Sequence, residues 1–182
     1  ALAARLDRRE WKIFATSRDA EGIAEINAQG FHGLPFASSL QIAADVTHLL
    51  ISAPPGEHGD PVLQWFQAQL QELSKSLKWL GYLSTMGVYG DRRGEWVDED
   101  SPLEPTTARG QRRLEAERSW LMLHKDYGLP VHLFRLAGIY GPGRNQLLTV
   151  RDGSARRIIK PGQIFSRIHA DDRTLDSTLD DL

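Results

Sequence analysis

Residues 82–90, which read YLSTMGVYG, decide the fold that we predict for this chain. An apolar run that begins at Trp79 leads into this stretch and predicts a buried strand. The strand ends at Ser84 and Thr85, and two glycines then allow the backbone to turn sharply. Because open α/β sheets bind ligands at the carboxyl ends of their central strands, the two hydroxyl groups mark a candidate site. A strand that ends in an ordinary polar turn would explain the same residues.

The composition of the 182 residues is that of an ordinary globular domain, with 41% hydrophobic and 25% charged residues. A formal net charge of −2 gives no electrostatic reason to expect nucleic acid or an anionic membrane as a partner. The chain has no cysteine, which excludes disulfides and thiolate chemistry and fits a reducing compartment. No apolar run approaches the roughly 20 residues of a membrane-spanning helix. We therefore expect a cytoplasmic protein.

Strand and helix signals alternate along the rest of the chain. We predict strands at residues 11–17, 31–36, 47–53, 79–84 and 131–136, and helices at residues 19–30, 60–77 and 106–127. Asp19 and Asp60 are candidate N-caps of the first two helices, and Thr106 or Thr107 is the candidate N-cap of the third. The second helix should bury Leu77 together with the apolar residues spaced along it, and the third should bury Leu114, Trp120 and Leu121. This order predicts an α/β fold with a doubly wound parallel sheet of the Rossmann type, in which the last three strands are central.

Five shorter motifs follow the opening stretch: DE at 98–99, P at 102, RL at 135–136, YGPGR at 140–144 and HADD at 169–172. Together with residues 82–90, and in this order, they resemble the extended short-chain dehydrogenases/reductases, the family of NAD-dependent nucleotide-sugar epimerases and dehydratases. The resemblance covers most of the chain and is specific for the fold, but it is much less specific for the reaction. It implies a Rossmann-type domain that binds NAD or NADP and a small-molecule substrate such as a nucleotide sugar.

Both ends of the sequence depart from this family pattern. Residues 1–6 resemble the end of the family's first helix, which a first strand and a glycine-rich turn precede in the family. A small substrate-binding lobe follows the position of Asp172 there. We therefore expect residues 1–172 to be a partial NAD(P)-binding domain without its first strand and C-terminal lobe, and residues 173–182 to be an unassigned tail. If the sequence is a piece of a longer protein, the chain should break near Asp172 and leave an open groove beside strand 47–53.

The resemblance also implies where a dinucleotide would bind. In the family, an acidic residue at the end of the second strand accepts the adenosine ribose hydroxyls, whereas an arginine there receives the 2′-phosphate of NADP. Here Ser17 and Arg18 occupy that position, so NADP is favoured over NAD, although a solvated surface arginine explains Arg18 as well. Ala53 and Pro54 should line the other side of the cofactor. The resemblance implies four further cofactor contacts: Ser84, Arg113, Gly138 and Ile139.

The catalytic residues implied by the resemblance are Thr85, Arg109 and Arg113. Thr85 matches the family's hydroxyl residue that hydrogen-bonds the reacting oxygen. Arg109 and Arg113 stand where the family has a Tyr-x-x-x-Lys pair, in which the lysine lowers the pKa of the phenol that exchanges a proton. An arginine side chain stays protonated at working pH, so Arg109 cannot be a general base. Arg113 could still hold a ribose hydroxyl.

Other chemistry-bearing residues have plainer explanations. Tyr89 belongs to the Val-Tyr-Gly turn and should be packed, and the acidic run 98–100 should be a solvated loop. The HADD segment is a strand-to-helix junction in the family, so we expect no metal site there. Four arginines of the last helix could grip a phosphate-bearing substrate, or could form a salt-bridged helix face with the neighbouring glutamates. They are Arg109, Arg112, Arg113 and Arg118.

Two classes of function therefore remain open. The first is an atypical NAD(P)-dependent epimerase, dehydratase or reductase that uses Thr85 and an unidentified acid. The second is a dinucleotide-binding sensor or interaction module without turnover, which the missing tyrosine favours. The retained Thr85 leads us to expect the enzyme. Whether it acts as a single chain or as a homodimer is left open.

Overall fold

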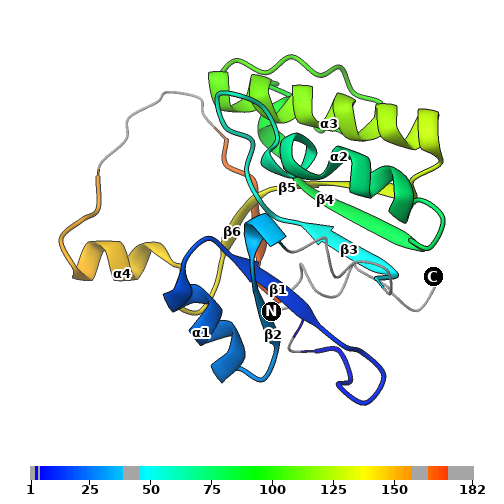
Figure 1. Cartoon of the computed structure of the whole chain (residues 1–182). Coiled ribbons are helices and arrows are strands. Elements are labelled where there is room, and N and C mark those ends of the chain that lie inside the picture. Colours follow the sequence, from blue (N-terminus) through cyan, green and yellow to red (C-terminus); the bar gives the residue numbers. More distant parts are fainter. Residues whose placement is uncertain (1–2, 4, 39–45, 157–163, 172–182) are drawn as a thin grey trace.

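The computed structural model describes residues 3, 5–38, 46–156 and 164–171 (Figure 1). Their strands are β1 (Phe14–Ser17), β2 (His32–Pro35), β3 (His48–Ile51), β4 (Trp79–Thr85), β5 (Val131–Leu136), β6 (Gly138–Tyr140) and β7 (Arg167–His169). Their α-helices are α1 (Ala20–Ala28), α2 (Pro61–Leu73), α3 (Ala108–Tyr127) and α4 (Gln146–Arg151). Every pairing between these strands is parallel, which confirms the predicted α/β fold class.

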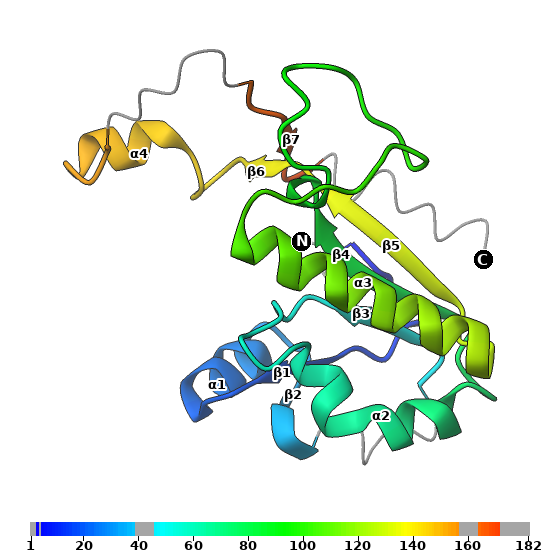
Figure 2. The same cartoon turned by 90° about the horizontal axis from the view of Figure 1, so that it is seen from above.

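β4 is the centre of a three-stranded sheet, with β3 on one side and β5 on the other. These are the three strands predicted to be central. α2 and α3 lie side by side over one face of this sheet (Figures 1 and 2). Leu80 and Tyr82 of β4 pack in one core cluster with Leu70 of α2 and Trp120 of α3, and all four side chains are fully buried. Asp60 links the two helices, because its Oδ2 accepts a hydrogen bond of 3.3 Å from Trp120 Nε1.

α1, α2 and α3 begin at predicted capping residues, and α3 also ends at its predicted glycine. Asp19, Asp60 and Thr107 each accept a hydrogen bond from a backbone N–H in the first turn of α1, α2 and α3, respectively. Gly128 ends α3 with a φ of 70°, a left-handed conformation that glycine adopts without strain. None of the described helices is both long enough and apolar enough to cross a membrane.

Two predicted inner contacts differ in the structure. Leu77 is buried, but it lies in the turn after α2, which ends at Leu73. The prediction for Leu121 is wrong, since this side chain is 44% exposed. Leu114 and Trp120 are buried, as predicted. The buried stripe of α3 continues from Trp120 to Leu123, one helical turn later, and this turns Leu121 toward solvent.

β1 and β2 form a sheet of their own, which corrects the prediction that they extend the central sheet. β1 and β3 exchange no ladder hydrogen bonds, and among the described strands β3 pairs with β4 alone. Trp11 connects the two sheets by packing edge-on against His48, with ring centroids 4.8 Å apart. The pairing agrees with the predicted open edge beside β3. The predicted chain break near Asp172 and the tail 173–182 lie outside the described residues, as do residues 1, 2 and 4 of the predicted helix end.

β6 and β7 form a third, two-stranded sheet beyond the end of β5. The loop between the 3₁₀ helix Met86–Val88 and α3 arches beside this small sheet (Figure 2). α4 extends away from the rest of the described chain in both views (Figures 1 and 2). The two larger sheets and their helices therefore form the body of the fold.

Candidate functional site

Thr85 ends β4 and caps the 3₁₀ helix Met86–Val88. Its Oγ1 accepts a hydrogen bond of 3.2 Å from the backbone N of Gly87. The first turn of α3 packs directly on this turn because Gly110 has no side chain: a Cβ there would lie 2.8 Å from the carbonyl oxygen of Gly87. Thr85 therefore lies at the carboxyl end of the central strand and beside the start of α3.

Arg109 and Arg113, one turn apart on α3, have different surroundings. Arg109 is exposed. Arg113 is only 7% exposed, and its Nη1 donates hydrogen bonds to the carbonyl oxygen of Leu83 at 2.9 Å and to the hydroxyl of Tyr82 at 3.1 Å. Its guanidinium carbon lies 5.5 Å from the centroid of the Tyr82 ring. Arg113 thus brings a buried positive charge to β4, two residues before Thr85.

Tyr82 and Tyr89, the two tyrosines nearest to Thr85 in the sequence, each accept a hydrogen bond from an arginine. Burial raises the pKa of Tyr82 to about 12, although the nearby Arg113 opposes this shift. A phenol with that pKa stays protonated at neutral pH and cannot act as a general base. Tyr89 is buried, as predicted, and its hydroxyl accepts a hydrogen bond of 2.9 Å from Arg135 Nη1. Neither phenol replaces the acid/base group of the family.

A buried ion pair that the sequence analysis missed lies next to this turn. Glu117 of α3 accepts hydrogen bonds from two nitrogens of Arg135, Nε at 3.2 Å and Nη2 at 3.0 Å. Its carboxylate also accepts a hydrogen bond from Ser84 Oγ, and Ser84 is buried. The position of Glu117, three residues before Trp120 on the buried stripe of α3, is the sequence signal that could have revealed it.

The predicted salt-bridged face of α3 is absent from the described residues. None of Arg109, Arg112, Arg113 and Arg118 forms an ion pair there. Glu117 pairs with Arg135 instead, and Glu115 accepts a hydrogen bond of 3.1 Å from Gln111 Nε2. The first turn of α3 also carries no acidic residue. The amino-terminal half of this helix is therefore a region of net positive charge.

Ser17 is the last residue of β1, and Arg18 lies between β1 and α1. Asp19, the next residue, caps α1: its Oδ1 accepts a hydrogen bond of 2.8 Å from the backbone N of Gly22. Ser17 Oγ lies 3.4 Å from the same oxygen. Arg18 is exposed, and it has no ion-pair partner among the residues that the structure describes. The charged side chain that remains available at the end of β1 is therefore an arginine.

The remaining cofactor candidates lie on other elements. Ala53, two residues beyond the end of β3, packs against the main core, whereas Pro54 is exposed. Gly138 and Ile139 belong to β6, which pairs with β7 and not with the central sheet. The candidates thus lie at or after the carboxyl ends of β1, β3 and β4, on α3, or in the small third sheet.

The HADD segment contains one close pair of titratable groups in its described part. His169 Nδ1 lies 3.5 Å from Asp171 Oδ2. The ring of His169 also packs edge-on against Tyr140, with centroids 5.1 Å apart. Across the described ranges, no cluster of three or more His, Cys, Asp or Glu residues has the arrangement of a metal site.

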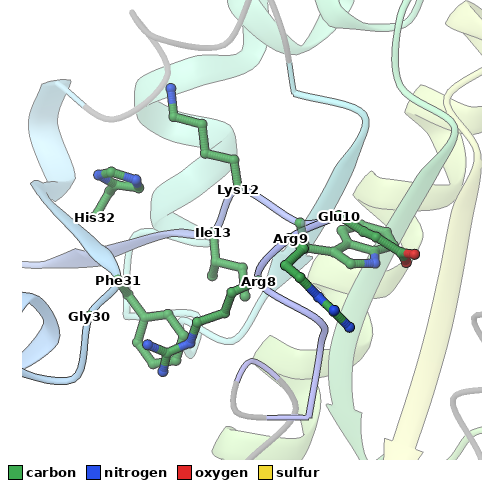
Figure 3. A pocket seen from close by; sticks show the side chains of 9 residues that line it. Arg8, Arg9, Glu10, Lys12, Ile13, Gly30, Phe31 and His32 are labelled. Carbon is green, nitrogen blue, oxygen red and sulfur yellow. The ribbon is translucent and has the colours of Figure 1, made fainter.

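A cavity of about 270 Å³ lies at the opposite, amino-terminal end of β1 (Figure 3). Its lining includes Arg8, Arg9, Trp11 and Phe31, and none of the predicted site residues. Arg8 donates a hydrogen bond of 2.9 Å to the carbonyl oxygen of Gln29 and lies over the ring of Phe31. Arg9 is paired with an aspartate in its own turn. The cations of this cavity are thus already engaged within the protein.

Sequence comparison identifies distant relatives of this chain. No protein-family model matches it. Protein YeeZ of Escherichia coli K12 is 28% identical over 157 residues, which cover 79% of this chain and 56% of YeeZ. A functionally unknown conserved protein from Silicibacter pomeroyi, of solved structure, is 46% identical and has a TM-score of 0.83, covering 93% of this chain and 60% of that one. The chain therefore spans less than two thirds of the length of these relatives.

More distant solved structures share the fold and carry known activities. The dTDP-glucose 4,6-dehydratase of Bacillus anthracis, solved in complex with NAD, is 19% identical and has a TM-score of 0.70. The match covers 94% of this chain and 64% of the dehydratase. Epimerases of UDP-linked sugars share the same fold. These likenesses confirm the resemblance that the sequence motifs carry. This chain has the fold of the NAD-dependent epimerases and dehydratases of the short-chain dehydrogenase/reductase superfamily.

Proposed function

We propose that this protein binds NADP in preference to NAD and is an epimerase/dehydratase-like protein that acts on a nucleotide sugar or a related small molecule. One observation carries the proposal: polar side chains lie at the carboxyl ends of parallel strands, with Ser17 at the end of β1, Arg18 directly after it, and Thr85 at the end of β4. Proteins with this fold have been crystallised with NAD and with UDP-linked sugars, which supports the same ligand classes here.

The residues after β1 fit the adenosine side of NADP. α1 begins at Ala20, so its free N–H groups and the positive end of its dipole lie next to Arg18. Asp19 Oδ1 accepts the Gly22 N–H as the cap of α1, whereas the exposed Arg18 has no ion-pair partner among the described residues. A 2′-phosphate would meet the guanidinium of Arg18. This arrangement favours NADP.

Replacing Arg18 with alanine should weaken the binding of NADP and leave that of NAD nearly unchanged. Losing one charge-assisted contact should cost about 1.5–3 kcal/mol of NADP binding free energy. Isothermal titration of the parent protein and of Arg18→Ala with both dinucleotides measures this difference. An equal loss for the two cofactors, or no loss for either, would remove Arg18 from the site.

Thr85 is the residue that we assign to the substrate. Bound NADP would supply hydride transfer at the nicotinamide ring. Because Thr85 Oγ1 accepts the Gly87 N–H, its own hydroxyl proton can be donated to an oxygen of the substrate. The buried charge of Arg113 lies close to this position and would stabilise negative charge that develops there. Neither Arg109 nor Arg113 can accept a proton, because an arginine side chain stays protonated. Thr85 and these two arginines therefore include no general base.

The alternative is a dinucleotide-binding module without turnover, and two observations favour it. The family's Tyr-x-x-x-Lys positions are Arg109 and Arg113 in this chain. The hydroxyls of Tyr82 and Tyr89 are bound to arginines within the fold. Chromatography of UDP- and dTDP-sugars incubated with the NADP-loaded protein separates the two functions, because an epimerase or dehydratase returns the hydride to the sugar and causes no net change in the cofactor. Conversion of a sugar supports the enzyme, whereas binding without any conversion supports the module.

A further inference from the structure

The ion pair between Glu117 and Arg135 connects four parts of the fold. Glu117 lies in the middle of α3 and is 1% exposed, whereas Arg135 lies on β5 directly opposite Ser84 of β4. The carboxylate accepts hydrogen bonds from two nitrogens of the guanidinium and from the hydroxyl of Ser84. A carboxylate buried to this degree needs such partners, because leaving a charge unpaired inside a protein is costly. The pair therefore ties α3 to both β5 and β4.

The third guanidinium nitrogen of Arg135, Nη1, donates hydrogen bonds to partners outside the ion pair. It donates a hydrogen bond of 2.9 Å to the hydroxyl of Tyr89 and one of 3.4 Å to the backbone carbonyl oxygen of Glu99. The guanidinium also lies 5.0 Å from the centroid of the Tyr89 ring. Tyr89 directly follows the 3₁₀ helix that Thr85 caps, and Glu99 lies in the loop of residues 91–105. One guanidinium thus joins the ion pair to the turn and to this loop.

Loop 91–105 is also held by apolar contacts, because Val97 and Leu103 pack against the small buried cluster of Val88, Tyr89 and Leu114. The other polar contacts of the loop are between its own residues. Arg92 forms an ion pair of 3.1 Å with Glu104 and donates to the carbonyl oxygen of Pro102. Ser101 Oγ donates a hydrogen bond of 2.7 Å to Asp98 Oδ1. These contacts shape the loop but do not attach it to the central sheet. The hydrogen bonds of Arg135 provide that attachment.

We propose that Glu117 and Arg135 are a positioning pair with two separable branches. The Ser84 branch fixes the last residues of β4 and thereby the hydroxyl of Thr85. The Tyr89 branch fixes loop 91–105 against the same turn. The first branch deepens the proposed function, since it concerns the residue that we assign to the substrate. The second branch concerns the loop alone and holds whether or not the protein binds a dinucleotide.

Two matched variants separate the branches. Tyr89→Phe removes the hydroxyl that Arg135 Nη1 contacts and keeps the ring, whereas Ser84→Ala removes the hydroxyl that Glu117 accepts and leaves the loop contacts intact. Trypsin cleavage after Arg93, an exposed residue of the loop, reports how often the loop opens. We expect Tyr89→Phe to raise the cleavage rate about tenfold in the ligand-free protein, the effect of losing one hydrogen bond to a charged group. We expect Ser84→Ala to leave that rate unchanged.

The thermal unfolding midpoint of each variant is the control for a general loss of stability. If both variants raise cleavage after Arg93 in proportion to their loss of stability, the pair is only a structural ion pair and the proposal fails. If Tyr89→Phe leaves the cleavage rate unchanged, the loop branch does not exist. Neither result depends on dinucleotide binding, so these outcomes are distinct from a failure of the proposed function.

The kinetics of two Ser84 variants test the Ser84 branch. If a nucleotide sugar is found to react, Ser84→Ala should lower kcat several-fold and leave KM nearly unchanged, because Thr85 would be misplaced rather than removed. Ser84→Thr, which keeps the hydroxyl, should restore kcat. A variant that raises KM alone, or that Ser84→Thr does not rescue, would show that Ser84 contacts the ligand itself and would overturn this branch.

Discussion

Replacing Arg135 with methionine should lower the free energy of unfolding by about 3–5 kcal/mol, the cost of leaving a buried charge without its partner. Glu117 would stay inside the protein and lose the hydrogen bonds from Nε and Nη2 of the guanidinium. Ser84 Oγ would remain its only hydrogen-bond donor among the contacts that the structure describes. Urea denaturation followed by circular dichroism measures the change.

The double variant Glu117→Gln with Arg135→Met is the matched control. It removes both charges and keeps a side-chain oxygen that Ser84 can donate to, so it should recover most of the lost stability. A loss below about 1 kcal/mol for Arg135→Met alone would mean that the pair contributes no more than an exposed salt bridge. That result would contradict the burial of Glu117 and remove the basis of the positioning pair.

Restoring the family's tyrosine and lysine should have the second large effect. If the protein is an enzyme with a degraded acid/base pair, Arg109→Tyr with Arg113→Lys should raise turnover of a nucleotide sugar by about 10²–10⁴, the usual contribution of a positioned acid or base. Position 109 lies in the first turn of α3, which packs on the Thr85 turn through Gly110. Steady-state kinetics with NADP and the same panel of sugars, followed by chromatography of the sugar product, measures the gain.

Arg113→Lys alone is the control for this pair, because it tests the loss of the contact between Arg113 and the Tyr82 hydroxyl without adding a phenol. If the parent already turns over a sugar and Arg109→Tyr abolishes the reaction, Arg109 has an electrostatic role of its own. If no variant reacts while all of them bind NADP, the enzyme proposal fails on these sugars and the binding module becomes the better function.

The fold could be predicted well because its signals are local. Asp60 and Thr107 mark the starts of α2 and α3 by a hydrogen bond within one turn, and Gly128 marks the end of α3 by its backbone conformation. The split between β1 and β3 could not be predicted, since it depends on which strands exchange hydrogen bonds across a long sequence separation. Leu121 shows the same limit on a smaller scale, because one residue along a helix turns a side chain by about 100°.

The candidate site was predictable in position but not in detail. The motif around Thr85 places a hydroxyl at the end of the central strand, and the structure has it there. The sequence does not reveal that Ser84 turns inward to Glu117, or that Arg113 bonds to Tyr82, because both contacts join residues about 30 positions apart. The role of Asp19 as a helix cap was predictable, and it is what leaves Arg18 as the charged group after β1.

A crystal structure of the protein grown with NADP tests the central claim most directly. The 2′-phosphate should lie at the amino terminus of α1 within hydrogen-bond distance of Arg18, and the nicotinamide should lie beside Thr85 at the end of β4. NADP bound in the cavity near Arg8 and Trp11, or a fully folded protein that takes up no dinucleotide at millimolar concentration, would contradict the proposed function.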